Sequence, residues 1–259
     1  MKVTTLGSWG GYPYQDGGTT SYLITGDNGF QLLMDAGSRA LNELEKEISP
    51  LDLDAVIISH YHPDHVADLG VLRHYRQLYP KHLWEPKALP IYGHNEDQFE
   101  FAKLTLPEVS VGIAYDVTGT QSIGPFDIAF IKTVHPVVCY AFRIVERKTG
   151  QVFVFTGDTG YFDELADFAQ GADLFLADVY LYEGNENHFA HLTSKEAGQI
   201  AQQARVKKLV LTHMPPVAPQ GIDPENHLAL LKAETVKYAG AIPVDLAMPH
   251  LSWDLGSLK

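Results

Sequence analysis

The chain has 259 residues, 45% of them hydrophobic, and a formal net charge of -13 at pH 7. This length and apolar content suit one large α/β domain or two fused halves, and we expect a single domain spanning residues 1–259. The acidic charge argues against a broad interface for long nucleic acid, because a surface of that sign repels polyanions. No apolar stretch is long enough to cross a bilayer, the N-terminus lacks a signal-peptide core, and Cys139 is the single cysteine. We therefore expect a cytoplasmic protein without a membrane partner and leave open whether it forms a homodimer.

Short apolar runs bounded by turn residues predict two strand-rich halves. In the first half we expect strands over 3–6, 21–25, 30–34 and 55–58, followed by a helix over 65–78. In the second half we expect strands over 126–134, 140–146, 152–155 and 209–212. Two more helices are predicted there, one after the capping box of Thr193 and Glu196, the other from Pro224 to Gly240. Two strand-rich halves with helices outside predict a sandwich of two sheets.

Three imidazoles and one carboxylate directly follow the predicted strand over 55–58. His60 and His62 are two residues apart, so on an extended backbone both project to the same side. Asp64 and His65 follow where the chain turns, and they can face a second point. Imidazole and carboxylate together are the usual ligands of zinc-like cations, whereas the alternative is a histidine-rich surface turn. One short loop can therefore supply ligands to two metal ions.

Three further candidate ligands occupy the same kind of position later in the chain. His135, Asp158 and His213 each stand at the end of an apolar, strand-like run. A lone histidine beside a strand is more often a hydrogen-bonded polar residue than a ligand. The recurrence of the pattern at four places, each at a strand end, indicates one shared site.

The motif His-x-His-x-Asp-His, with the three later residues in order, resembles the metallo-β-lactamase superfamily. The resemblance implies an α/β fold, a four-layer αββα sandwich with metals between the sheet edges. It implies two divalent ions that share a hydroxide nucleophile. One ion would be held by His60, His62 and His135 and the other by Asp64, His65 and His213, with Asp158 as the bridge. Ligands of nitrogen and oxygen alone suit Zn²⁺ and also permit Mn²⁺ or Fe.

His191 lies in a His-Leu-Thr element just before a capped helix. This arrangement resembles the ribonuclease Z-like branch of the superfamily, in which such a histidine is a general acid toward the phosphoryl group. A phosphodiester needs a proton donor because its leaving alkoxide is poor. The alternative is a structural histidine near a helix N-terminus, a poor place for an imidazolium. The resemblance thus implies a metal-dependent hydrolase, with Asp64 and His191 as its catalytic residues.

The long arm that ribonuclease Z inserts before the bridging aspartate is absent, since little more than a hairpin joins His135 to Asp158. We therefore expect a phosphodiesterase acting on a small or nucleotide phosphodiester. An ester, thioester or lactone hydrolase and a tRNA 3′-processing endoribonuclease are the alternatives.

Several residues near the motif have two interpretations. Asp35 either accepts a hydrogen bond from a ligand imidazole or simply forms a turn. Trp9, Tyr12 and Tyr14 either stack on a base or ribose or pack within their own loop. His94 has no motif context, so we predict a structural role for it, as for the other isolated histidines.

Overall fold

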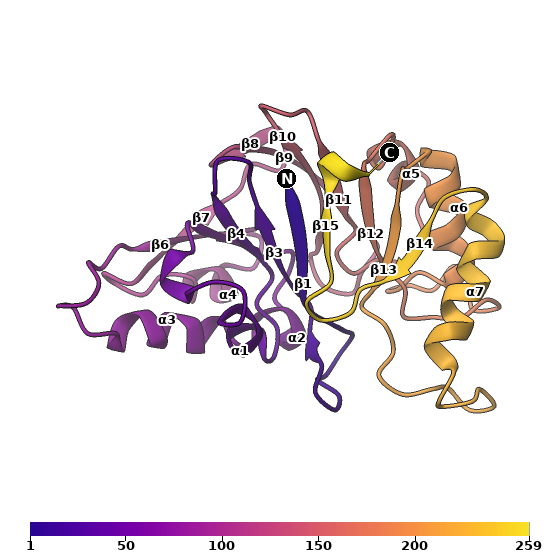
Figure 1. Ribbon diagram of the computed structural model, residues 1–259, viewed down its shortest axis with the longest axis horizontal. Coiled ribbons are helices and arrows are strands. Elements are labelled where there is room, and N and C mark those ends of the chain that lie inside the picture. Colours follow the sequence, from indigo (N-terminus) through magenta and orange to yellow (C-terminus); the bar gives the residue numbers. More distant parts are fainter. Residues whose placement is uncertain (259) are drawn as a thin grey trace.

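Two mixed β-sheets pack face to face in the computed structural model, which describes residues 1–258 (Figure 1). The first sheet has the order β15-β1-β3-β4-β5-β6-β7, with β2 beside β1. Its strands are β1 Lys2–Trp9, β2 Gly18–Thr19, β3 Ser21–Thr25, β4 Gln31–Met34, β5 Ala55–Ile57, β6 Leu89–Gly93, β7 Ser110–Ala114 and β15 Ser252–Asp254. The second sheet has the order β14-β13-β12-β11-β10-β9-β8. Its strands are β8 Thr120–Ile123, β9 Phe126–Lys132, β10 Tyr140–Glu146, β11 Val152–Phe155, β12 Leu174–Asp178, β13 Leu209–Thr212 and β14 Val244–Leu246.

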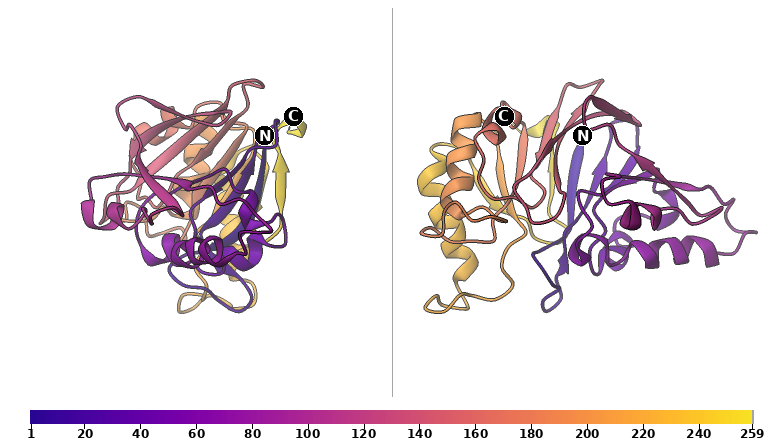
Figure 2. Two further views of the ribbon diagram at one scale, coloured as in Figure 1. Left: turned by 90° about the vertical axis from the view of Figure 1, so that its left-hand side faces the viewer. Right: turned by 180° about the vertical axis from the view of Figure 1, so that it is seen from behind.

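Helices cover the outer face of each sheet, which gives the four expected layers (Figures 1 and 2). Outside the first sheet lie α1 Ala40–Leu44, α2 Pro63–Val66, α3 Leu69–Leu78 and α4 Gln98–Ala102. Outside the second lie α5 Glu164–Phe168, α6 Ser194–Ala204 and α7 His227–Ala239. Two short 3₁₀ helices, η1 Pro50–Asp52 and η2 Leu255–Ser257, complete the elements. No helix within residues 1–258 has both the length and the apolar run needed to cross a membrane.

Three apolar clusters hold these layers together. The largest lies between the sheets and contains the buried side chains of Tyr22, Phe142 and Phe155. The alternation of side chains along a strand assigns neighbouring residues to different clusters. On β13, for example, Val210 belongs to this central cluster, whereas Leu209 belongs to the cluster beneath α5, α6 and α7. Strands covered on both faces must be apolar at successive positions, which explains their unbroken apolar runs.

The helix expected over 65–78 is wrong as a single element, because it is broken into α2 and α3. Asp68 lies at the break, where its backbone N–H donates to the carbonyl of Ala36 at 3.0 Å. Its carboxylate also accepts from the backbone N–H of Leu41 at 3.0 Å. These hydrogen bonds connect the loop after β4 to the break, and the helix does not continue through it.

The helix expected from Pro224 begins later, at His227. Asp223 holds the intervening residues in a turn, since its carboxylate accepts from the backbone N–H of Glu225 at 3.1 Å and from Nδ2 of Asn226 at 2.7 Å. The predicted end at Gly240 is confirmed, with a φ of 65° that favours glycine. The capping box of Thr193 and Glu196 at the start of α6 is also confirmed.

The topology brings the ends of several strands to one edge of the sandwich. Strands β4 to β7 are parallel neighbours in the first sheet, as are β11 to β14 in the second. The carboxyl ends of parallel strands meet at the same edge of a sheet, where open α/β folds bind their ligands. The predicted metal ligands follow β5, β9, β11 and β13.

Candidate metal centre

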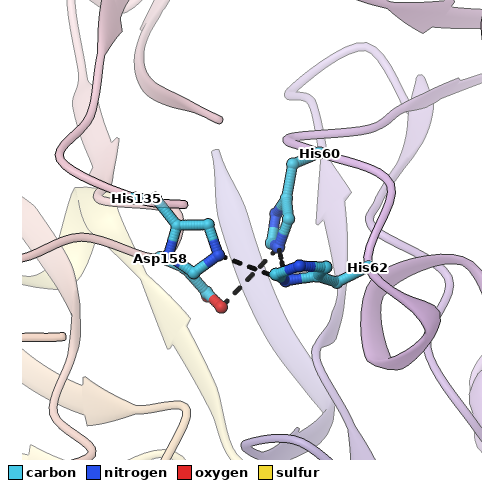
Figure 3. Close-up of side chains that lie close together, drawn as sticks. All are labelled: His60, His62, His135 and Asp158. Carbon is cyan, nitrogen blue, oxygen red and sulfur yellow. Dashed lines mark hydrogen bonds and ion pairs between the residues drawn. The ribbon is translucent and has the colours of Figure 1, made fainter. Parts of the chain in front are cut away.

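The first group of candidate ligands brings three imidazoles together beside one carboxylate (Figure 3). His62 is the last extended residue before Pro63 opens α2, so its side chain stays on the same side as that of His60. Nδ1 of His62 lies 3.1 Å from Nε2 of His60 and 3.1 Å from Nε2 of His135. Oδ2 of Asp158 lies 3.7 Å from Nε2 of His60. One loop of the first sheet and two loops of the second therefore supply this single cluster.

The second group shares Asp158 with the first. Nε2 of His213 lies 3.1 Å from Oδ2 of Asp64 and 3.2 Å from Oδ2 of Asp158. Nε2 of His65 lies 3.3 Å from Oδ1 of Asp158. All four side chains are buried. The structure thus brings together all seven residues that the sequence analysis proposed as ligands, in the two groups that the resemblance implied.

The spacing of these atoms suits divalent cations. Ligand atoms about 2.0–2.2 Å from a tetrahedral zinc ion lie roughly 3.3–3.6 Å from one another, and the atoms above are separated by 3.1 to 3.7 Å. Nε2 of His65 and Oδ1 of Asp158 are buried without a hydrogen bond among residues 1–258, although they lie 3.3 Å apart. Such a pair is better explained as two ligands of one ion than as hydrogen-bond partners.

The electrostatics of the site also favour a cation. Burial alone would raise the pKa of Asp158, but His213 and His65 hold it well below its usual range. Burial alone would lower the pKa of His65, but Asp158 and Asp35 raise it to about 10. Burial, with His65 beside it, lowers the pKa of His60, which therefore stays neutral, as a metal ligand must. The carboxylates thus hold positive charge at the position where a cation would bind.

Asp35 orients one of the candidate ligands. Its Oδ2 accepts from Nδ1 of His65 at 2.8 Å, which directs Nε2 of that ring toward the centre. Its Oδ1 and Oδ2 also accept from the backbone N–H and the hydroxyl of Ser59, at 2.7 and 2.8 Å. Of the two interpretations of Asp35, the structure supports the hydrogen-bond acceptor, and a φ of 55° places its backbone in the left-handed region.

His191 lies at the edge of the second group, held by a carboxylate that sequence reasoning missed. Its Nδ1 donates to Oδ2 of Asp178 at 2.9 Å. The same oxygen accepts from the backbone N–H of Thr159 at 3.0 Å, and Oδ1 lies 3.4 Å from Nδ1 of His213. Asp178 ends β12, directly after an apolar run, which is the signal that identified Asp158. The same carboxylate therefore contacts both a candidate ligand and the candidate general acid.

The N-terminal loop covers the second group closely. The backbone N–H of Gly11 donates to Oδ2 of Asp64 at 2.8 Å. A Cβ added to Gly10 would lie 2.7 Å from Nδ1 of His213, which is closer than side chains pack. Trp9 packs against the cluster beneath the helices and meets Tyr14 edge to face at 6.1 Å, so these two rings fit the packing interpretation. Glycine at position 10 allows the backbone to approach the site.

Two of the isolated histidines make ordinary structural contacts. Nδ1 of His227 lies 3.0 Å from the hydroxyl of Tyr182, and Nε2 of His250 lies 2.8 Å from Oε2 of Glu43. These contacts agree with the structural role predicted for them. His94 also lies outside both ligand groups.

Comparisons with known proteins agree with this architecture. Residues 27–214 match the β-lactamase superfamily domain. The chain is 41% identical to the probable metallo-hydrolase YhfI of Bacillus subtilis (strain 168) over 217 residues, which cover 83% of this chain and 87% of that protein. The crystal structure of YhfI matches with a TM-score of 0.87 and 36% identity over 98% of this chain and 99% of that chain. The short form of human tRNase Z shares the fold, with a TM-score of 0.73 and 20% identity over 98% of this chain and 99% of that chain. This chain therefore belongs to the β-lactamase superfamily and has the metallo-β-lactamase fold that its histidine motif implies.

Proposed function

We propose that this chain is a dinuclear metal-dependent phosphodiesterase that hydrolyses small phosphodiesters, nucleotide diesters included. The observation that carries the proposal is the position of His191. Its ring centroid lies 5.1 Å from that of His213 and 5.7 Å from that of His135, one residue from each ligand group. A phosphodiesterase needs a proton donor there, because its leaving alkoxide is poor. Hydrolysis in general also agrees with the name of YhfI.

Each residue of the site has a separate role in the proposed reaction. When bound, two divalent ions would supply Lewis-acid activation of the phosphoryl group and of a water molecule. Asp178 holds Nδ1 of His191, so that the proton on Nε2 is the one available to the leaving oxygen. Asp64 is placed as a ligand, and the backbone N–H of Gly11 fixes its Oδ2. The Asp178–His191 pair thus positions a proton donor next to the candidate ligands.

Two features support a small substrate. The net charge of -13 disfavours a long polyanion. Between His135 and Asp158 the chain forms only the hairpin of β10 and β11, with no extended arm. A folded RNA would therefore find few cations and no long clamp, whereas a single phosphodiester needs only the centre itself.

The test replaces His191 with alanine and compares two substrates. Thymidine 5′-ethyl phosphate and thymidine 5′-(p-nitrophenyl) phosphate share a nucleoside and differ only in the leaving group. If His191 protonates the leaving oxygen, His191→Ala should slow the ethyl ester by roughly 10²–10⁴-fold. The p-nitrophenyl ester should lose far less, because p-nitrophenolate departs without a proton.

Metal content is the control for this comparison. His191 is not assigned as a ligand, so His191→Ala should keep the metal content of the unmodified protein by elemental analysis. Equal losses on both esters, or loss of a metal ion, would mean that His191 is a ligand or a structural residue. Hydrolysis of simple esters or lactones without hydrolysis of either phosphodiester would favour the alternative hydrolase.

A further inference from the structure

A cavity of about 580 Å³ adjoins the first ligand group, a size within the range of small-molecule sites. Its lining includes His62, whose Nδ1 also points into the cluster with His60 and His135. A group in this cavity therefore lies next to the candidate metal centre. On the proposed function, that group is an ester substituent of the phosphodiester.

His94 forms part of the cavity wall and lacks the partners that a buried imidazole normally has. His94 is 2% exposed, and its ring centroid lies 4.6 Å from that of Tyr61. Neither ring nitrogen makes a hydrogen bond with good geometry to any residue of 1–258. Burial lowers the pKa of His94, and the backbone of Val138 and the nearby Glu96 offset this only in part. Both nitrogens are shielded from solvent, so His94 forms an uncharged part of the cavity wall.

The remaining polar wall is acidic. Glu96, Asp97 and Glu100 all line the cavity. Lys132 pairs with Glu96 at 2.7 Å and Lys103 pairs with Glu100 at 2.5 Å, but neither lysine is among the lining residues. The wall therefore repels a substituent that carries a phosphate or carboxylate and attracts one that donates hydrogen bonds or carries an amine.

We infer that the cavity beside His62 binds the organic ester substituent of the substrate and selects substituents with amine or other hydrogen-bond donors over anionic ones. This inference rests on the proposed phosphodiesterase function and narrows its substrate class. Such substrates carry one phosphodiester and no further phosphate. The three carboxylates are its specificity-determining residues.

The test uses three p-nitrophenyl phosphodiesters whose second ester group is ethyl, 2-aminoethyl or 2-carboxyethyl. All three release the same p-nitrophenolate, so differences in kcat/KM report recognition of the second group alone. We expect the order aminoethyl, ethyl, carboxyethyl, with at least about a tenfold ratio between the first and the last, because each group meets several partly exposed charges.

Two variants locate the source of this ratio. Asp97→Asn combined with Glu100→Gln removes two wall charges at the surface, and asparagine can still cap α4 as Asp97 does. The ratio should fall to less than about threefold in this double variant. Glu85→Gln makes the same kind of change on the exposed segment between α3 and β6, outside the cavity, and should leave the ratio unchanged.

The outcomes separate this inference from the function on which it rests. Hydrolysis of all three esters at similar kcat/KM would overturn the inference and leave the phosphodiesterase standing. A ratio that survives in the double variant would overturn it as well, because the net charge of the chain, not the cavity, would then be responsible. Failure of the metal-loaded protein to hydrolyse any of the esters would refute the proposed function and this inference with it.

Discussion

Replacement of Asp178 by asparagine tests whether this buried carboxylate makes His191 an effective proton donor. The change removes one charge and almost no volume. Asp178 is fully buried, and its Oδ2 lies 2.9 Å from Nδ1 of His191. The carboxylate accepts the hydrogen bond from Nδ1 and keeps Nε2 directed at the leaving oxygen, and an amide oxygen accepts this bond more weakly.

The size of the effect follows from the geometry. A hydrogen bond to a charged group contributes about 1.5–3 kcal/mol. The side chain of His191 is 18% exposed, so solvent screens part of this interaction. A remaining loss of about 1–3 kcal/mol corresponds to roughly 5- to 150-fold in rate. This is smaller than the loss expected for His191→Ala, because Asp178→Asn keeps the donor and weakens only its support.

The assay is the pair of thymidine 5′-esters, measured as kcat/KM with metal content determined in parallel. Asp178→Asn should slow the ethyl ester by the factor above and the p-nitrophenyl ester by much less. Asp173→Asn is the matched control, since Asp173 precedes the same strand and accepts from the backbone N–H of Val152 at 2.7 Å. Equal losses on both esters, or the same selective loss in Asp173→Asn, would refute the role assigned to Asp178.

Four further outcomes are expected. Asp158→Ala should lose one or both ions and nearly all hydrolysis, and near-normal activity with full metal content would end the dinuclear proposal. Gly10→Ala should reduce activity, because its Cβ would lie 2.7 Å from Nδ1 of His213; unchanged kinetics would show that the loop yields freely. Metal affinity should rise with pH by up to about tenfold per unit for each proton displaced. The reason is that Asp158 and Asp35 overcome the effect of burial and raise the pKa of His65 to about 10, so that without metal this ring is protonated at neutral pH and metal binding must displace its proton. Calorimetry in buffers of different ionisation enthalpy should detect the released protons. The absence of proton release would contradict this prediction. Precursor tRNA should be cleaved poorly, and small diesters should show only a weak salt dependence, whereas efficient, salt-sensitive tRNA cleavage would favour the endoribonuclease.

The candidate ligands were predictable because each follows a strand. An apolar run marks a buried strand, and a polar residue at its end lies at a sheet edge, as His135 and His213 do. The division into two groups came from the resemblance to a family, since spacing alone does not say which strands are neighbours. Asp178 carried the same signal and was missed, because it belongs to no motif that the sequence analysis used.

The rest depended on contacts between distant segments. The helix break at Asp68 is held by hydrogen bonds to Ala36 and Leu41, about thirty residues earlier. The periodic pattern of apolar residues in a sequence does not reveal hydrogen bonds between distant segments. The cavity that His94 lines was hidden for the same reason, because it forms only where the segment after β6 meets Pro136 and Val137 after β9. Sequence reasoning located the chemistry of the centre more readily than its surroundings.

Two buried carboxylates explain why two imidazoles of this site, those of His65 and His191, face inward. Asp35 follows β4 of the first sheet and fixes Nδ1 of His65, while Asp178 ends β12 of the second sheet and fixes Nδ1 of His191. A ring held at Nδ1 by a rigid strand end can only present Nε2 to the cleft. The ligand groups themselves join the sheets, because Asp158 of the second sheet meets His60 and His65 of the first. Cations bound there would therefore cross-link the two sheets. The ligand positions that determine the chemistry would then also link metal binding to the packing of the sandwich.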